Sequence, residues 1–104
     1  MILFKSVHVF PICIGLKTQT RRTWKTARVK VGSVQLAKTQ MISKAYFARL
    51  KVLAVYQERL GDMTEQDAYD EGGYTLEGYK ETFERIYGFY DPDLLVYVVK
   101  FETI

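Results

Sequence analysis

The sequence predicts an α+β domain in which a mostly antiparallel sheet is flanked by short helices. Strand-like segments occur towards both ends of the chain, and two helical segments separate the last strand from the others. A length of 104 residues leaves room for one core, and the 48% of hydrophobic residues, which include 14% aromatic ones, are enough to fill it. We therefore expect residues 1–104 to form a single domain.

The N-terminal segment predicts a strand followed by a short helix. Residues 2–4 are an apolar run suited to a strand, and residues 6–15 end in a glycine, which favours a helix C-terminus. Val7, Phe10 and Ile14 recur at helical spacing. This spacing predicts that the three side chains form the apolar stripe of that helix.

A basic loop and two strands are expected next. Residues 16–30 are polar and rich in Lys, Arg and Thr without a sustained period, which favours an extended loop. A turn at residues 32–33 leads into a strand over 34–38. Residues 46–56 alternate between apolar and basic side chains and are the clearest strand of the sequence.

Two helices and a buried strand complete the expected fold. Thr64 and Asp67 have the spacing of a helix capping box, which predicts a short helix ending near residue 70. A second helix is expected from residue 75 to the glycine at 88. After a turn at 91–93, the apolar run 94–101 favours a strand buried on both sides.

Charge is distributed unevenly along the chain. Residues 1–59 contain 12 Lys and Arg against one acid, a net charge of +11, whereas residues 60–104 contain 3 against 11, a net charge of −8. In one domain this asymmetry predicts a positive face, which attracts polyanions, and a negative face. The alternative is that solvated charges are segregated by chance between the two halves.

Residue types limit the chemistry that the chain can support. Cys13 and His8 are the only cysteine and histidine, so neither a disulfide nor a four-ligand Cys/His zinc site can form, and we expect no metal or other cofactor. We expect His8 to be structural and Cys13 to be buried. No apolar run reaches the length of a membrane helix and the N-terminus does not resemble a signal peptide, so we expect a cytoplasmic protein without a membrane partner.

Residues 15–22, Gly-Leu-Lys-Thr-Gln-Thr-Arg-Arg, contain the densest group of reactive and charged side chains. Arg21 and Arg22 can hold a phosphate together with Lys17, and a lysine of lowered pKa can activate a threonine hydroxyl such as that of Thr20. The alternative interpretation is a solvated basic loop.

This segment resembles the signature of ASCH domains, and the resemblance extends over nearly the whole chain. Ser33 departs from the aspartate that is usual in the family's Gly-Asp turn. The segments that follow in the family's order are 30–34, 47–55, 60–68, 71–76, the helix through residue 87 and the closing strand. The resemblance implies a PUA-like β-barrel with flanking short helices and a basic cleft that binds RNA or a modified nucleoside.

Some small ASCH proteins are amidohydrolases that remove the acetyl group of N4-acetylcytidine. The resemblance places their catalytic lysine, threonine and glutamate at Lys17, Thr20 and Glu71. The glycines at 72–73 make the last spacing one residue longer than in the family, so Asp70 competes with Glu71 for the acidic position.

An aromatic side chain among basic ones favours stacking of single-stranded RNA, and Trp24 has this setting. The alternative is that Trp24 is half-buried at the rim of the barrel. The candidate RNA or ligand-binding residues are Thr18, Arg21, Arg22, Trp24, Lys25, Arg28 and Lys30.

Recognition of RNA or of a modified nucleoside is thus the expected function. The amidohydrolase is the alternative, which leaves open whether the protein is an enzyme, and a ribonuclease is a lesser one because no carboxylate cluster for metal accompanies the basic loop. The acidic helices offer a surface for a protein partner. The sequence does not determine the oligomeric state.

Overall fold

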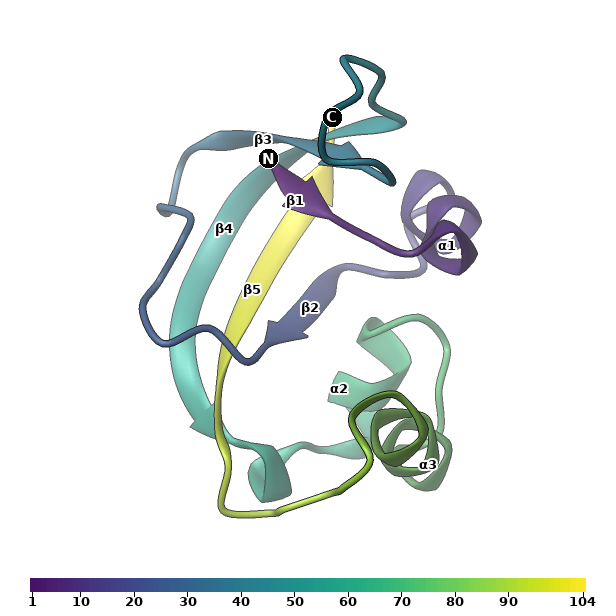
Figure 1. Cartoon of the computed structure of the whole chain (residues 1–104), viewed down its shortest axis with the longest axis vertical. Helices are drawn as coiled ribbons and strands as arrows, with labels where there is room; N and C mark the ends of the chain where they lie inside the picture. Colours follow the sequence, from purple (N-terminus) through teal and green to yellow (C-terminus); the bar gives the residue numbers. More distant parts are fainter.

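A computed structural model describes all 104 residues and shows one curled sheet with helices along its open side (Figure 1). The sheet has the order β1-β3-β4-β5-β2; β1 and β3 are parallel, and every other pair is antiparallel. The strands are β1 (Ile2–Leu3), β2 (Gln19–Arg22), β3 (Val34–Lys38), β4 (Ala48–Arg59) and β5 (Leu95–Thr103). The predicted α+β class with a mostly antiparallel, barrel-like sheet is confirmed.

Three short α-helices flank this half-barrel. Helix α1 lies beside β1 and the start of β2, and α2 and α3 lie together below β2 in the view of Figure 1. The helices are α1 (Val9–Cys13), α2 (Glu65–Asp70) and α3 (Leu76–Tyr87), with single 3₁₀ turns η1 (Ser6–His8) and η2 (Leu60–Asp62). None of the helices has the length and hydropathy of a transmembrane segment.

Two apolar clusters hold these layers together. The larger cluster lies within the curled sheet and includes Phe4, Leu50 and Phe101, each at most 4% exposed. The smaller cluster joins α3 to the sheet through Phe83, which packs with Leu60 and Val96. Helix α3 is therefore attached to the sheet along one stripe, and its aromatic side chains Tyr79, Phe83 and Tyr87 also line a cavity.

Several local predictions are confirmed by the hydrogen bonds. The Thr64 hydroxyl accepts from the Asp67 backbone N–H, and the Asp67 carboxylate accepts from the Thr64 backbone N–H, which together form the capping box of α2. Thr75 caps α3, and Gly88 ends that helix with a positive φ of 81°. The strand expected at 34–38 is β3.

One prediction about the first third of the chain is wrong, and the short helix expected over 6–15 is present but does not bury the apolar residues whose spacing predicted it. The expected loop over 16–30 contains β2, because residues 19–22 pair with β5 in an antiparallel ladder. The predicted stripe of α1 is exposed, with 71% of Val7, 70% of Phe10 and 58% of Ile14 accessible. The α-helix begins only at residue 9 after a 3₁₀ turn, so the helical spacing does not continue back to Val7, and the helix contacts the core through Ile12 instead.

The cysteine of α1 is also placed differently from the prediction. Cys13 was expected to be buried but is exposed, and its only polar contact is a long one of 3.9 Å from the thiol to the Phe47 carbonyl oxygen. The buried position on this helix belongs to its neighbour Ile12, which is fully inaccessible.

Candidate ligand-binding cavity

Lys17 lies in the segment that connects α1 to β2. Its backbone N–H donates to the Pro11 carbonyl, which closes the end of α1, and the next residue, Thr18, bonds to both Asp70 and Phe101. Because β2 begins only at Gln19, the alternation of side chains between the two faces of the strand does not extend to Lys17. Its side chain can therefore point to the same cavity as Thr20.

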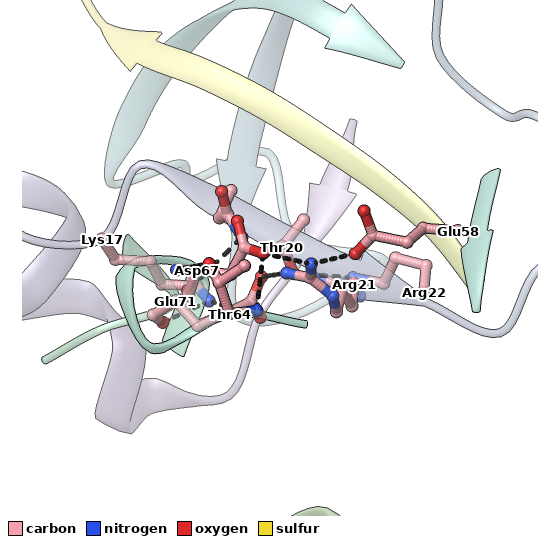
Figure 2. Close-up of polar contacts among 9 residues, drawn as sticks. Lys17, Thr20, Arg21, Arg22, Glu58, Thr64, Asp67 and Glu71 are labelled. Atoms are coloured by element: carbon pink, nitrogen blue, oxygen red, sulfur yellow. Dashed lines mark hydrogen bonds and ion pairs between the residues drawn. The ribbon is translucent and has the colours of Figure 1, made fainter. Parts of the chain in front are cut away.

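The Lys17 ammonium is paired with Glu71 at the end of α2 (Figure 2). The Nζ atom donates to the Glu71 carbonyl oxygen at 2.7 Å and lies 3.8 Å from the carboxylate Oε1 atom. Both residues are only 3% exposed. Asp70, the competing acid, instead accepts a hydrogen bond from Gln66, so the geometry places Glu71 rather than Asp70 beside Lys17.

Arg21 is surrounded by three carboxylates from the acidic half of the chain and the end of β4 (Figure 2). One terminal nitrogen of its guanidinium, Nη1, donates to Glu71 at 3.1 Å, and the other, Nη2, donates to Glu58 at 2.7 Å and lies 3.5 Å from Asp67. Its side chain is 1% exposed. The expected separation into a positive and a negative face therefore fails at this point, because the two halves of the chain meet in a buried ion-pair network.

Thr20 and Arg22 lie on the same side of β2 and contact each other. The Arg22 Nε atom donates to the Thr20 hydroxyl oxygen at 3.2 Å. The Arg22 guanidinium also lies over the Phe4 ring, 4.9 Å from its centroid. Arg22 forms no ion pair, in contrast to Arg21 beside it.

These side chains surround a cavity of about 160 Å³. One wall carries the polar residues Lys17, Thr20, Arg21, Arg22 and Glu71. The facing wall is aromatic and comes from α3 and the turn before it, with Tyr74, Tyr79, Phe83 and Tyr87. The remaining lining residues are Leu3, Phe4, Lys5, His8, Thr82 and Ile86. A flat aromatic ligand can thus be contacted on its face by rings and at its edge by charged groups.

The cavity changes the acid–base properties of its lining. Burial holds the pKa of Lys17 below its ordinary value, and the charges of Arg22 and Arg21 act in the same direction against the opposing effect of Glu71. Burial also lowers the pKa of Arg22 and raises that of Tyr79. Lys17 is therefore the cationic group of the site that gives up its proton most readily, since guanidinium groups stay protonated.

His8 gives a testable pH dependence. Burial, followed by the charges of Lys17, Arg22 and Lys5, lowers its pKa from 6.5 to about 4. The unfolded chain therefore binds this proton first, and the free energy of unfolding falls as pH drops from 6.5 towards 4. We expect a loss of about 1 kcal/mol at pH 5, allowing for the partial exposure of the ring. Urea unfolding at pH 7 and pH 5 should show this loss in the wild type and not in His8→Gln.

The structure brings together only part of the predicted site. Lys17, Thr20, Arg21, Arg22 and Glu71 line the cavity. The other candidates do not line it: Thr18, Trp24, Lys25, Arg28 and Lys30.

Trp24 is the clearest example of a candidate that lies elsewhere. Its ring packs against the larger apolar cluster and lies 6.3 Å from the Tyr97 ring, with the Arg28 guanidinium 5.9 Å from it on the outside. This arrangement fits the half-buried alternative. Lys25, Arg28 and Lys30, which are close to Trp24 in the sequence, are exposed and give the surface of this segment a basic character away from the cavity.

Other cavity residues were not recognised from the sequence. His8, expected to be structural, and the α3 tyrosines Tyr79 and Tyr87, which are not among the predicted site residues, line the cavity. Phe4 reaches the cavity from the residue just after β1. The tyrosine spacing of α3 was visible in the sequence, but only the placement of α3 opposite β2 reveals its role.

The half-barrel with these three helices has the ASCH-like fold. No family model matches the sequence, and no curated protein sequence matches it significantly. Among solved structures, the ASCH domain from Lactobacillus crispatus JV V101 superposes with a TM-score of 0.76 at 17% identity, over 93% of this chain and 70% of that one.

Two further solved structures share the fold. A protein from Enterococcus faecalis V583, described under the family name DUF984, has a TM-score of 0.67 and 20% identity, over 92% of this chain and 66% of that one. The hypothetical protein PH0355 has a TM-score of 0.71 and 16% identity, over 98% of this chain and 95% of that one. At these identities the similarity establishes the fold.

Proposed function

We propose that the cavity binds a nucleoside, either free or as one residue of an RNA. The observation that carries this proposal is the composition of its two walls: aromatic side chains of α3 face the charged side chains of β2 across about 160 Å³. Nucleobases are flat and carry hydrogen-bonding groups at their edges, so they match such a site. The resemblance of residues 15–22 to the ASCH signature supports the same class of ligand.

Tyr87 offers the sharpest test of stacking, because it lines the cavity and is 43% exposed, and its ring packs against one core residue, Phe83. We expect Tyr87→Ala to weaken binding of N4-acetylcytidine or cytidine by about 1–3 kcal/mol, which corresponds to roughly 5- to 150-fold. Titration calorimetry would measure this loss of binding affinity. Tyr46→Ala is the matched control, since Tyr46 is 51% exposed and lies outside the cavity. Equal effects of the two variants would contradict the proposal.

A second candidate function is hydrolysis of an acylated nucleobase amine such as that of N4-acetylcytidine. The specific observation in its favour is that a buried lysine, a threonine hydroxyl held by an arginine and a buried glutamate share one cavity. Lys17 is the base, because its pKa is lowered by burial. Thr20 is the nucleophile, and its oxygen already accepts a hydrogen bond from Arg22.

The reaction would proceed in two steps. In the first, neutral Lys17 takes the Thr20 proton while the hydroxyl oxygen attacks the acetyl carbonyl, and the Arg22 guanidinium stabilises the negative charge that develops on the carbonyl oxygen. The C–N bond then breaks, and the amine leaves with the proton from Lys17, which Glu71 holds in place. Water hydrolyses the acetyl-threonine ester in the second step, so one water is consumed for each cytidine and acetate released.

A further inference from the structure

The positive charges that line the cavity are not all paired with negative ones. Lys17 and Arg21 face the Glu71 carboxylate, and Arg21 has two further acidic partners. Lys5 and Arg22 line the same cavity, yet neither forms an ion pair with any carboxylate of the protein. The part of the cavity lined by Lys5, His8 and Arg22, which we term the cationic corner, therefore carries an excess of positive charge.

Arg22 has hydrogen-bonding capacity left for a ligand. Only its Nε atom donates within the protein, to Thr20, and its two terminal nitrogens make no intramolecular hydrogen bond. The guanidinium is held by its stacking on Phe4, so its fork is oriented before any ligand arrives. Oriented guanidinium groups bind phosphate through two parallel hydrogen bonds, and a lysine adds a point charge.

We infer that the ligand of this cavity carries a phosphate group, and that this phosphate binds in the cationic corner among Lys5, His8 and Arg22. The inference rests on the proposed nucleoside-binding function and narrows its ligand to a nucleotide. Both a free nucleotide and a residue within RNA supply this phosphate, and the two sources differ in whether the phosphate is a monoester or a diester.

His8 provides an internal reporter of the bound phosphate. The groups facing it are Lys5 and Phe4 on its own segment, together with Lys17 and Arg22. Across the cavity lie Glu71, just after α2, Tyr74, and Tyr79 and Tyr87 of α3. Without ligand, burial and then the charges of the nearby cations hold the pKa of His8 at about 4. A bound phosphate offsets the charges of the cations and therefore raises this pKa. By linkage, protonation of His8 tightens phosphate binding by the same factor.

The experiment is a proton NMR titration of His8, which gives the only imidazole signals because it is the only histidine. The signals are followed from pH 3.5 to 8 in the free protein and at saturation with cytidine, with cytidine 5′-monophosphate and with the oligonucleotide CpCpC. We expect the pKa of His8 to rise by at least one unit with a phosphate-containing ligand and to stay unchanged with cytidine. A shift with the monophosphate alone identifies a free nucleotide as the ligand, and a shift with CpCpC identifies an RNA residue.

Affinities at pH 7 and low salt complete the test. We expect cytidine 5′-monophosphate or CpCpC to bind at least tenfold more tightly than cytidine, and Lys5→Gln to reduce this ratio of affinities. Lys44→Gln is the control, since Lys44 is an exposed lysine of the β3–β4 loop outside the cavity. Equal affinities for all three ligands, together with an unchanged pKa of His8, would overturn phosphate binding in the cationic corner and leave the nucleoside-binding function standing. If none of the three ligands binds, both the cationic corner and the nucleoside-binding function are overturned.

Discussion

Replacement of Arg21 by methionine is expected to lower the free energy of unfolding by about 3–5 kcal/mol, the cost of leaving buried charges without their partner. Arg21 contacts Glu58, Asp67 and Glu71, whose side chains are 22%, 17% and 4% exposed. Without the guanidinium, three carboxylates remain close together in a site that water reaches poorly. Urea unfolding followed by circular dichroism measures the change, and Arg21→Lys, which keeps one charge but not the fork, should fall between wild type and methionine.

Arg59→Met is the matched control for this prediction. Arg59 also pairs with a carboxylate, Asp93 at 2.6 Å, but the two side chains are 52% and 77% exposed. Exposed pairs contribute about 0–1 kcal/mol, so the control should remain close to wild type. Losses of similar size in Arg21→Met and Arg59→Met would show that the buried network does not stabilise this fold.

The deficit of Arg21→Met should also depend on pH. Although burial acts against ionisation of Asp67, hydrogen bonds from Thr64 and the charge of Arg21 outweigh it and lower the pKa of this carboxyl. A carboxyl with a lowered folded pKa contributes stability that is present above its unfolded pKa, near 3.8, and is lost as pH falls below that value. The difference between wild type and Arg21→Met should therefore narrow below about pH 4.

The second large effect is expected in catalysis. If the cavity hydrolyses N4-acetylcytidine, Lys17→Met should lower kcat/KM by about 10²–10⁴-fold, the usual contribution of a general base. Folding should be retained, because Glu71 keeps its ion pair with Arg21 when the lysine is removed. Chromatography of released cytidine measures the rate, and Lys44→Met, a change of an exposed lysine outside the cavity, should have wild-type activity.

The pH profile separates a base from a merely structural lysine. Because burial lowers the pKa of Lys17, kcat/KM should rise with pH as the amine loses its proton and should level off below the ordinary lysine pKa of 10.5. Thr20→Val should abolish this activity at every pH. A Thr20→Val variant with wild-type cytidine release would exclude Thr20 as the nucleophile.

Much of the fold could be predicted because its signals are local. The capping box at Thr64, the glycine at residue 88 and the apolar alternation before residue 56 each report the conformation of adjacent residues. The α+β class follows from their order. Residues 15–22 could be predicted to contribute to the candidate site for a similar reason, since their charged and hydroxyl side chains are adjacent in sequence.

The remaining features depend on contacts between distant segments. Strand β2 has no alternation of its own and is extended because it pairs with β5, some 78 positions later in the chain. The partners of Arg21 come from β4 and α2, and no sequence spacing relates Glu58 to Glu71. The position of His8 in the cavity could not be predicted for the same reason, because the cations near it lie before and after α1.

The most direct test of the nucleoside-binding cavity is to titrate isotope-labelled protein with N4-acetylcytidine and cytidine 5′-monophosphate, and to map the amide shifts on the fold. The cavity walls predict the largest changes in β2, at Glu71 and along α3 near Tyr79 and Tyr87. Changes centred instead on the exposed basic surface around Trp24, or no saturable change at all, would contradict the assignment of the cavity as the binding site.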